Sequence, residues 1–512
     1  MMLGELIAGL DVKLLTPGAS AVRVCDITED SRTAMPGSLF VARAGTKADG
    51  RAYALDAVRS GASAVLTDDA GPLMSGTECP AAAIAVARDV LSVSALMAER
   101  FYGDPTSRLT LAGVTGTNGK TTISWLVWQI LNDAQHRCGL VGTVVVDDGT
   151  EVAPAVMTTP PAIELSRTFG RMLEAGCVAG SMEVSSHSLD QGRVAGLRFK
   201  IAAFTNLTQD HLDYHGTMEV YAAAKATLFA MLPSDGVAVM NADDPASERM
   251  LAECPARAVR CSLVSDEPRG SVAAGQVRID ATNLHGMNLT LAGPFGSATT
   301  RVPMVGRYNA MNVLQAACVA HAMGVPGEEV VKSLSALSAP PGRLERVTDE
   351  GDPFAIYVDY AHTDDGLRSV LTASREAMRG GDIPGRLGVV FGCGGDRDKT
   401  KRPKMGKAAA DHADMVFVTS DNPRTESPSS IIDMIRAGMT DAQRASAVVN
   451  ADRAAAIARA VEWCRSGDVL VIAGKGHETE QVLPDGSGGT LRVAFDDRVH
   501  ARGAIAARKD RP

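Results

Sequence analysis

The sequence predicts an α/β protein of three domains: a small N-terminal α/β domain, a central domain built on a parallel sheet, and a C-terminal Rossmann-like domain. Its 512 residues are enough for three domains of about 100–200 residues each. Short apolar runs alternate with helix-like segments, which is typical of parallel strands joined by helices. Several runs end in polar, glycine-containing motifs, and such motifs usually lie at the ligand-binding edge of a parallel sheet.

The N-terminal domain is predicted to span residues 1–105. Ser38–Ala42 and Ala64–Leu66 are predicted as short buried strands, and Tyr53–Ser60 has the apolar spacing of a helix. The turn-like sequence Tyr102-Gly103-Asp104-Pro105 ends this unit.

The central domain is predicted to span residues 106–341. A strand over Leu109–Val114 runs into the loop Gly113-Val-Thr-Gly116-Thr-Asn-Gly119-Lys120-Thr121-Thr122, and a helix follows. Glycines allow N–H groups to surround phosphate oxygens, Lys120 can reach the terminal phosphates, and Thr121 is placed to hold Mg²⁺. The general pattern has glycine at position 114, where this chain has Val, so the loop is a variant. A glycine-rich turn with a chance lysine is the alternative, but the strand–loop–helix order favours a P-loop ATPase-like domain that binds ATP or a close relative.

Two strand ends of the central domain carry candidate metal ligands. Glu183 closes the predicted strand Gly180–Glu183, and His211 lies in the polar segment that follows the strand Ile201–Phe204. Glu and His residues at strand ends near a phosphate loop suit Mg²⁺ coordination. For His211 alone, a structural loop histidine is an equally good explanation.

Lys225 lies in a predicted helix, Tyr221–Phe229, that carries hardly any other charge. Desolvation against the neighbouring aromatic rings would lower its pKa, and a neutral amine can react with CO₂ to form a carbamate, which is an oxygen ligand for a metal. On the residues alone, a lysine that extends along the helix to solvent is the simpler explanation.

The C-terminal domain is predicted to span residues 342–512, after the hinge-like Pro340-Pro341-Gly342. Four apolar runs each end in a polar motif, which predicts one shared binding site outside the carboxyl ends of parallel strands. The runs are 355–358, 387–391, 415–418 and 469–472, and the motifs are Asp359–His362, Gly392–Arg397, Ser420–Arg424 and Gly474–Glu478. A Rossmann dehydrogenase is disfavoured, because Arg397 stands where its third glycine would be.

Charge and cysteine usage exclude several protein classes. With 51 Lys and Arg against 60 Asp and Glu, the net charge of −9 argues against broad binding of nucleic acid or of an anionic membrane. No uncharged stretch approaches the length of a membrane helix, about 18–20 residues, so we expect no membrane insertion. Nine cysteines without any C-x-x-C pair predict reduced core thiols in a cytoplasmic protein. We also expect the protein to be a monomer.

Six motifs, in this order, resemble those of the Mur ligase family, the ATP-dependent amide-forming ligases of peptidoglycan precursor synthesis. The motifs are Gly113–Thr122, Met182–His187, Asn206–Gly216, Gly306–Asn312, Pro341–Arg343 and Asp359–His362. The resemblance covers essentially the whole chain. A folylpolyglutamate synthetase would share the phosphate loop but would lack the motif Asp421-Asn422-Pro423-Arg424. A non-catalytic nucleotide-binding protein is disfavoured because Glu183, His211, Lys225 and Arg424 are all retained.

The resemblance implies the reaction. Asp421-Asn422-Pro423-Arg424 is similar to the motif of the family members that add 2,6-diaminopimelate to UDP-N-acetylmuramoyl-L-alanyl-D-glutamate (the UDP-MurNAc-dipeptide) through an acyl-phosphate intermediate. Arg424 can form a two-pronged pair with a carboxylate, and Glu478 can accept the distal ammonium of diaminopimelate. The implied ligands are therefore ATP, Mg²⁺, the UDP-linked dipeptide and diaminopimelate.

The resemblance also implies the site residues. Lys120, Lys225 and His211 are the implied catalytic residues, and Lys225 is implied to be N6-carboxylysine, a carbamate formed from CO₂. Mg²⁺ is implied to bind Thr121, Glu183, His211 and the carbamate of Lys225. The implied ATP-binding residues are Gly116, Thr117, Asn118, Gly119, Lys120, Thr121, Thr122, Asn309, Arg343, Asp359 and His362. The implied residues for the UDP-linked substrate are Ser31, Thr158, Thr159, Ser185, Gln191 and Arg193, and those for diaminopimelate are Arg397, Asp421, Asn422, Pro423, Arg424, Gly474 and Glu478.

The chain departs from the family pattern at two places. Thr46-Lys47 stands where many relatives have His-Gln, which bears on the diphosphate contacts of the first domain. Asp364 stands where proline is usual, so we expect a different loop geometry there.

Overall fold

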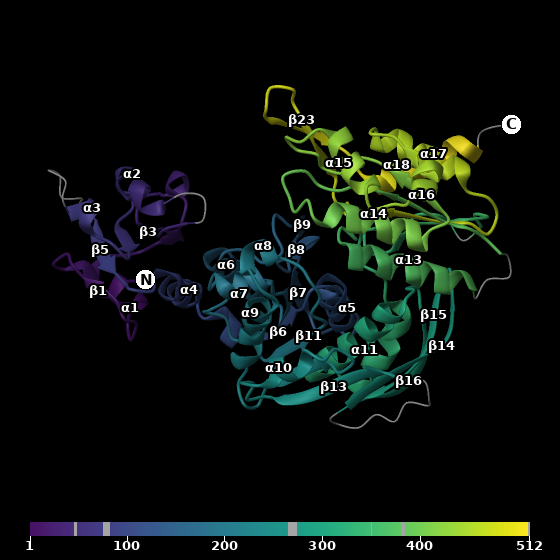
Figure 1. Ribbon diagram of the computed structural model, residues 1–512. Helices are drawn as coiled ribbons and strands as arrows, with labels where there is room; N and C mark the ends of the chain where they lie inside the picture. Colours follow the sequence, from purple (N-terminus) through teal and green to yellow (C-terminus); the bar gives the residue numbers. More distant parts are fainter. Residues whose placement is uncertain (46–48, 75–81, 265–273, 350, 380–383, 510–512) are drawn as a thin grey trace.

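The computed structural model describes residues 1–45, 49–74, 82–264, 274–349, 351–379 and 384–509. Three sheets follow one another along the chain, from the N-terminal sheet at one end of the molecule, through a large central sheet, to the C-terminal sheet (Figure 1). The predicted boundaries at 105/106 and 341/342 lie in the connections between these sheets, and we keep them as a proposed division of the chain. The unusual pair Thr46-Lys47 lies outside the described residues.

The N-terminal sheet has five strands in the order β1-β5-β4-β3-β2, all parallel except β1, which pairs antiparallel with β5. The predicted strands are confirmed as β3 and β4, and the predicted helix as α2. The strands are β1 (Lys13–Leu14), β2 (Asp26–Thr28), β3 (Ser38–Ala42), β4 (Ala64–Thr67) and β5 (Ala83–Val86), and the helices are α1 (Leu3–Leu6), α2 (Ala54–Arg59), α3 (Gly71–Met74) and α4 (Val90–Phe101).

The central sheet has eleven strands, in the order β16-β15-β14-β13-β12-β11-β6-β10-β7-β8-β9. Its strands are β6 (Thr110–Thr115), β7 (Cys138–Val141), β8 (Val145–Asp147), β9 (Val152–Pro154), β10 (Ala179–Glu183), β11 (Ile201–Phe204), β12 (Val237–Asn241), β13 (Arg257–Leu263), β14 (Ala274–Asn283), β15 (Gly286–Gly293) and β16 (Gly296–Val302). Its helices are α5 (Lys120–Asp133), α6 (Ala162–Glu174), α7 (Ser186–Asp190), α8 (Leu212–His215), α9 (Met218–Ala230), α10 (Ser247–Leu251), α11 (Arg307–Ala322) and α12 (Gly327–Ser333).

The central sheet is parallel from β7 to β14, as predicted, but antiparallel strands extend it at both ends. The five strands at the centre of the parallel part, β12, β11, β6, β10 and β7, are buried on both faces, because α5 and α11 pack on one side and α6 and α9 on the other. Neighbouring residues Leu111 and Ala112 of β6 accordingly face different cores. Exposed and buried residues interleave along β15, which is typical of an antiparallel strand with one face toward solvent.

The C-terminal sheet has six strands in the order β17-β18-β22-β19-β20-β21, parallel except for β17. The four predicted apolar runs are confirmed as β18, β19, β20 and β22. The strands are β17 (Glu345–Arg346), β18 (Ala355–Asp359), β19 (Leu387–Phe391), β20 (Met415–Val418), β21 (Val448–Val449) and β22 (Val469–Ala473), and a separate hairpin holds β23 (Glu480–Pro484) and β24 (Thr490–Ala494). The helices are α13 (Asp364–Arg379), α14 (Lys401–His412), α15 (Pro428–Arg436), α16 (Asp441–Ser446), α17 (Arg453–Trp463) and α18 (Asp497–Lys509).

Hydrogen bonds connect the three units of the chain that hold these sheets. Ser166 of α6 donates to the buried carboxylate of Glu99 in α4 at 2.8 Å, which fastens the N-terminal unit to the central one. Tyr357 of β18 donates its hydroxyl to the Leu284 carbonyl at 2.5 Å and joins the C-terminal unit to the antiparallel edge of the central sheet.

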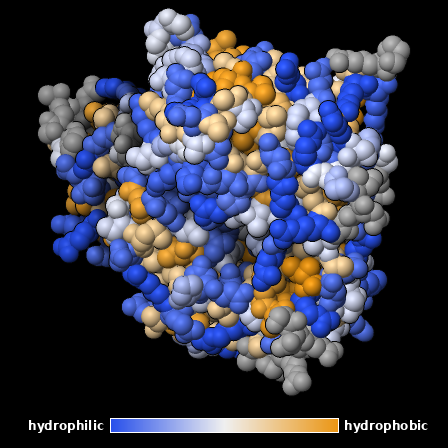
Figure 2. All heavy atoms as spheres, turned by 45° about the vertical axis from the view of Figure 1, so that its right-hand side comes forward, coloured by the Kyte–Doolittle hydropathy of each residue, from blue (hydrophilic) through white to orange (hydrophobic). Residues whose placement is uncertain are grey.

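The surface is drawn from one side in Figure 2. Figure 2 shows a face on which hydrophilic residues predominate and apolar residues form separate patches. Within the described ranges, no helix is long and apolar enough to cross a membrane. The eight cysteines that the structure describes are all free, as predicted, but Cys25 is exposed and Cys254 is partly exposed, so these two are not core thiols.

Candidate active site

The phosphate loop connects β6 to α5, as the sequence predicts, and its glycines are required by geometry. At Gly116, φ is +145°, and an added Cβ would lie 1.8 Å from Oγ1 of Thr205. Gly119 also has a positive φ, 92°, at the start of α5. The segment after β11 holds the loop in place, because Asn118 N donates to Asn206 Oδ1 at 2.9 Å and Thr117 N donates to Asn206 O at 2.8 Å.

Two lysines meet at one carbonyl of this loop. Lys120 Nζ donates to Gly116 O at 3.0 Å and to Thr117 O at 2.8 Å, and Lys225 Nζ donates to the same Gly116 O at 2.8 Å. Lys225 has 1% of its surface exposed and lies 4.4 Å from the Tyr221 ring centre, so the interpretation as a solvent-extended lysine is wrong. Burial, with Lys120 nearby, holds the pKa of Lys225 well below its usual value, and burial also lowers the pKa of Lys120.

Glu183 is the centre of an oxygen cluster beside the loop. Its Oε2 accepts from Thr121 Oγ1 at 2.9 Å, and its Oε1 accepts from the backbone N–H of Thr143 at 2.6 Å. The Thr143 hydroxyl also donates to Oε2 at 3.0 Å. Mg²⁺ prefers oxygen ligands, so Thr121 and Glu183 fit such an ion. Thr143 was missed because it follows β7 in a short loop without a recognisable motif.

His211 lies apart from this oxygen cluster. Its backbone has a positive φ of 54°, its ring centre is 4.7 Å from that of His187, and its Nε2 is 3.5 Å from a carboxylate oxygen of Asp210. Burial lowers the pKa of His211, although Asp210 opposes the shift. Across the described ranges, no three His, Cys, Asp or Glu side chains gather in a way that could hold a metal ion.

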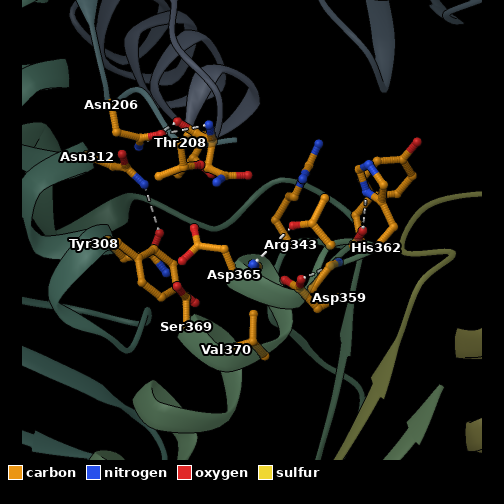
Figure 3. A pocket seen from close by; sticks show the side chains of 18 residues that line it. Asn206, Thr208, Tyr308, Asn312, Arg343, Asp359, His362, Asp365, Ser369 and Val370 are labelled. Carbon is orange, nitrogen blue, oxygen red and sulfur yellow. Dashed lines mark hydrogen bonds between the residues drawn. The ribbon is translucent and has the colours of Figure 1, made fainter. Parts of the chain in front are cut away.

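A first pocket lies between the phosphate loop and the C-terminal domain (Figure 3). Asn206, Asn312 and Tyr308 enter it from one side, and Arg343, Asp359 and His362 enter from the other. The predicted ATP-binding residues that line this pocket are Asn118, Gly119, Thr122, Asn309, Arg343, Asp359 and His362. The other predicted ATP residues, Gly116, Thr117, Lys120 and Thr121, belong to the adjoining part of the loop.

Fixed hydrogen bonds hold the polar groups of this pocket. Asp359 accepts the backbone N–H of Leu344 at 2.6 Å and that of Ala361 at 2.7 Å, while burial raises its pKa. The Arg343 guanidinium lies 4.7 Å from the ring centre of Tyr360 and donates to Thr121 Oγ1 at 3.1 Å. Arg343 therefore reaches from the C-terminal domain to the oxygen cluster of the central domain.

A second pocket adjoins the first and combines residues of the two domains. From the central domain it is lined by His211 and its neighbours, and from the C-terminal domain by most of the predicted diaminopimelate residues: Arg397, Asp421, Asn422, Arg424, Gly474 and Glu478. Pro423 is not among the lining residues. Asp364, where relatives usually have proline, also lines this pocket at the start of α13.

The loop after β20 gives this second pocket its shape. Arg424 has a positive φ of 53°, and its guanidinium donates to Gly395 O at 2.5 Å. Asn422 Nδ2 donates to Glu478 Oε2 at 2.9 Å. Burial and the nearby Arg397 lower the pKa of Arg424, so two guanidinium groups concentrate positive charge at this end of the pocket.

The predicted residues for the UDP-linked substrate fall into two places. In the central domain, a chain of contacts joins them: Thr159 O accepts from Arg193 Nη1 at 2.8 Å, and Arg193 Nη2 donates to Gln191 Oε1 at 2.6 Å. Thr159 Oγ1 accepts from the Ser185 N–H at 3.1 Å, and Thr158 Oγ1 is 3.0 Å from Thr143 Oγ1.

Ser31 lines a third pocket, which lies in the N-terminal domain together with Asp30, Arg32, Phe40 and Arg43. Arg43 pairs with Glu29 at 3.1 Å. Burial, and after it the charge of Arg43, lowers the pKa of Arg193, so Arg43 of this pocket acts electrostatically on a residue of the central domain.

Comparison with known proteins gives full-length matches. Sequence models of the Mur ligase family match residues 24–101 (catalytic domain), 114–320 (middle domain) and 342–476 (glutamate ligase domain). A UDP-N-acetylmuramoyl-L-alanyl-D-glutamate–2,6-diaminopimelate ligase of Gloeobacter violaceus is 43% identical over 100% of this chain and 99% of its own length.

Solved structures agree. A structure of a UDP-N-acetylmuramoyl-L-alanyl-D-glutamate–2,6-diaminopimelate ligase has a TM-score of 0.68 at 33% identity and covers 100% of both chains. The MurF ligase of Thermotoga maritima in complex with ADP shares the fold, with a TM-score of 0.59 at 16% identity over 88% of this chain and 94% of that one.

Proposed function

The chain belongs to the Mur ligase family, and on this basis we propose that it is an ATP-dependent ligase that adds 2,6-diaminopimelate to UDP-N-acetylmuramoyl-L-alanyl-D-glutamate in peptidoglycan precursor synthesis. One observation carries the proposal for this chain. The second pocket joins His211 of the phosphate-loop domain to Arg424 and Glu478 of the C-terminal domain, so an amino acid bound there would lie next to the place where phosphate chemistry occurs.

The reaction must first activate a carboxylate. The γ-carboxylate of D-glutamate attacks the γ-phosphate of ATP, ADP leaves, and an acyl phosphate forms. Two anions meet in this step, so positive charge and N–H donors have to stabilise it. Lys120 is suited to this role, because its ammonium now binds only loop carbonyls and can turn toward a phosphate.

Thr121 and Glu183 are the residues that we propose to hold one Mg²⁺ ion, and the carbamate of Lys225, with His211, would hold a second one. When bound, the ions neutralise charge on phosphate oxygens. The buried amine of Lys225 favours the neutral form that adds to CO₂, and loss of one proton then leaves the carbamate. The adjacent Gly116 carbonyl holds Lys225 Nζ against the phosphate loop.

Diaminopimelate would bind through its distal carboxylate and ammonium. The guanidinium of Arg424 offers two parallel N–H donors for the carboxylate, with Arg397 beside it, and Glu478 offers an acceptor for the ammonium. The free amine at the other end of the molecule attacks the acyl carbon, phosphate leaves, and the amine loses a proton as the amide forms.

The UDP-linked dipeptide would bridge the other two domains. We assign Ser31 to its uridine end and Thr158, Thr159, Ser185, Gln191 and Arg193 to its muramoyl-peptide end. The charge of Arg43 acts on Arg193, and this supports a single ligand that contacts both domains. Two neighbouring cations suit an anionic substrate.

The cellular setting follows from the proposed reaction. Because ATP and UDP-linked precursors are intracellular compounds, we propose that the enzyme acts in the cytoplasm, as a monomer, without nucleic acid or membrane insertion. Its product serves the cell wall, and hence cell shape and cell division.

The test is phosphate release with a panel of amino acids. With ATP, Mg²⁺ and the UDP-linked dipeptide, we expect release that requires diaminopimelate and is much slower with lysine or ornithine. Omission of the UDP-linked dipeptide should abolish release. Equal rates with lysine, or phosphate release that needs no amino acid, would contradict the proposal. Glutamate with a folate substrate serves as the control for a folylpolyglutamate synthetase.

A further inference from the structure

We propose that Lys475 is a positioning residue for the incoming amino acid: its buried ammonium fixes Glu478 and Asn422 so that one Glu478 oxygen faces the distal ammonium of the substrate. This inference rests on the proposed function and deepens it. Neither the motif comparison nor the predicted ligand set assigns a role to Lys475, although it lies between two residues of that set, Gly474 and Glu478.

The backbone after β22 directs Lys475 inward. Gly474 has a φ of +116°, and an added Cβ would lie 2.7 Å from Asp421 Oδ2. Gly476 has a φ of +55°, and its added Cβ would lie 2.7 Å from Gly342 O. Two left-handed glycines on either side of one residue form a sharp turn that few other residues could adopt. The Lys475 side chain, with 0% of its surface exposed, is thereby held beneath the loop that follows β20.

The ammonium of Lys475 closes a triangle of hydrogen bonds. Nζ donates to Glu478 Oε2 at 2.8 Å and to Asn422 Oδ1 at 3.1 Å, and Asn422 Nδ2 donates to the same Glu478 Oε2 at 2.9 Å. Asn422 Oδ1 also accepts the backbone N–H of Val482 at 3.0 Å. Because two N–H donors meet Oδ1, the amide of Asn422 has one orientation only, with its own donor toward Glu478.

Oxygen Oε2 of Glu478 therefore already has two donors, one of them charged. The other oxygen of Glu478, Oε1, is therefore the acceptor for the substrate ammonium, and its position is fixed before the substrate binds. A carboxylate held in this way binds a ligand without first losing the freedom of its own rotamers.

The charge of Lys475 also bears on selectivity. With Lys475 present, the carboxylate of Glu478 is already neutralised, and Arg424 and Arg397 face the same pocket. A lone ammonium, as in lysine, would add positive charge beside Arg424 and Arg397 and leave Arg424 without a carboxylate. The distal carboxylate of diaminopimelate compensates that charge, so Lys475 favours the zwitterionic end over the cationic one.

The test compares kinetic constants of the Lys475→Met variant with those of the wild type. Met has a similar shape but no ammonium. We expect KM for diaminopimelate to rise about tenfold or more, which corresponds to the loss of one charge-assisted hydrogen bond. KM for ATP and for the UDP-linked dipeptide should stay unchanged, and the preference for diaminopimelate over lysine should fall. The matched control is Lys332→Met, which removes a lysine three residues from a glutamate on an exposed helix and should change none of these constants.

A double-mutant cycle with Glu478→Gln separates positioning from a purely structural role. If Lys475 acts through Glu478, adding Lys475→Met to Glu478→Gln raises KM for diaminopimelate much less than it does in the wild type. The double variant also retains no half-buried carboxylate without its Lys475 partner, so it serves as the test should Lys475→Met alone fail to fold. In that case, the comparison is between the double variant and Glu478→Gln.

Three results overturn the inference: an unchanged KM for diaminopimelate in Lys475→Met, an equal rise of KM for all three substrates, or a full additional rise in the Glu478→Gln background. If the wild-type enzyme uses diaminopimelate and Lys475→Met has the same kinetic constants, the role of Lys475 is wrong but the proposed function stands. A wild-type enzyme that does not use diaminopimelate removes the proposed function, and the inference with it.

Discussion

At the scale of single residues, the environment of Lys225 has the largest consequence for the mechanism. A lysine with 1% exposure, a pKa far below its usual value and another ammonium close by is poorly suited to remain a cation. The carbamate removes that conflict, because it converts the side chain into an anion beside Lys120. The sequence alone favoured a solvent-exposed lysine, since neither the spacing nor the composition of α9 reveals which of its faces is covered.

The corresponding prediction concerns Lys225→Ala. We expect the variant to lose activity by about 100-fold, because a metal-ligating group and a neighbour of Lys120 disappear together. Short-chain carboxylates such as acetate or propionate should restore part of the activity by supplying the missing oxygens. Steady-state phosphate release with and without these additives measures both effects.

Lys200→Ala is the control for this experiment. Lys200 is partly exposed and pairs with Asp235. The rate of Lys200→Ala should therefore not change when short-chain carboxylates are added. Full activity of Lys225→Ala without additives would exclude the carbamate.

At the scale of elements, the strands that carry the site could be predicted because they are continuous apolar runs buried on both faces. β18, β19, β20 and β22 were recognisable for this reason, and so was the phosphate loop between β6 and α5. The antiparallel strands β15 and β16 were not, because half-exposed strands have weaker apolar runs and no chemical motif.

Contacts within the site were harder to predict than the elements. Thr143 donates to Glu183 and Lys475 binds Glu478, yet both roles depend on side chains that meet only when distant strands lie next to each other. For Lys475 one signal was present: glycines on either side of a lysine, directly after a buried strand. His211 shows the opposite case, since its motif was recognisable but its ring contacts His187 and Asp210 instead of Thr121 or Glu183.

An element-scale prediction concerns the pair that anchors α14 to the loop after β20. Arg402, with 0% side-chain exposure, donates to Glu426 at 2.9 and 2.8 Å, and this pairing lowers the pKa of Glu426 from 4.5 to about 2. Because the folded pKa is below the unfolded one, the stabilisation is complete above pH 4.5 and is lost as the pH falls from 4.5 to about 2.

Glu426→Gln should therefore lower the free energy of unfolding by about 2 kcal/mol at neutral pH, and the difference from wild type should shrink as the solution is acidified. Urea unfolding at a series of pH values measures this difference. Glu480→Gln, which breaks an exposed pair with Arg492, is the control and should change stability little. A difference that stays constant down to the lowest pH would contradict the assignment.

At the scale of the whole molecule, the net charge of −9 is an average over unlike parts. The lining of the second pocket combines four basic side chains with six acidic ones, so both charges of a zwitterion would find partners there: Arg397, Lys401, Lys404, Arg424, Asp210, Asp213, Asp364, Asp398, Asp421 and Glu478. The first and second pockets lie where the central and C-terminal domains meet, the third lies in the N-terminal domain, and each suits one charged ligand. Sequence motifs could indicate which residues bind each ligand. They could not indicate that Arg43 of the N-terminal domain would lower the pKa of Arg193 in the central domain.

The central claim is that these domains together bond the substrate carboxylate to phosphate before the amide forms, so that one carboxylate oxygen leaves with phosphate when the amine attacks. Its most direct test uses UDP-linked dipeptide labelled with ¹⁸O in the γ-carboxylate of D-glutamate, with ATP and diaminopimelate, and mass analysis of the products. We predict one labelled oxygen in each released phosphate and the other in the new amide. Phosphate without label, formed by attack of water on ATP, would contradict the account.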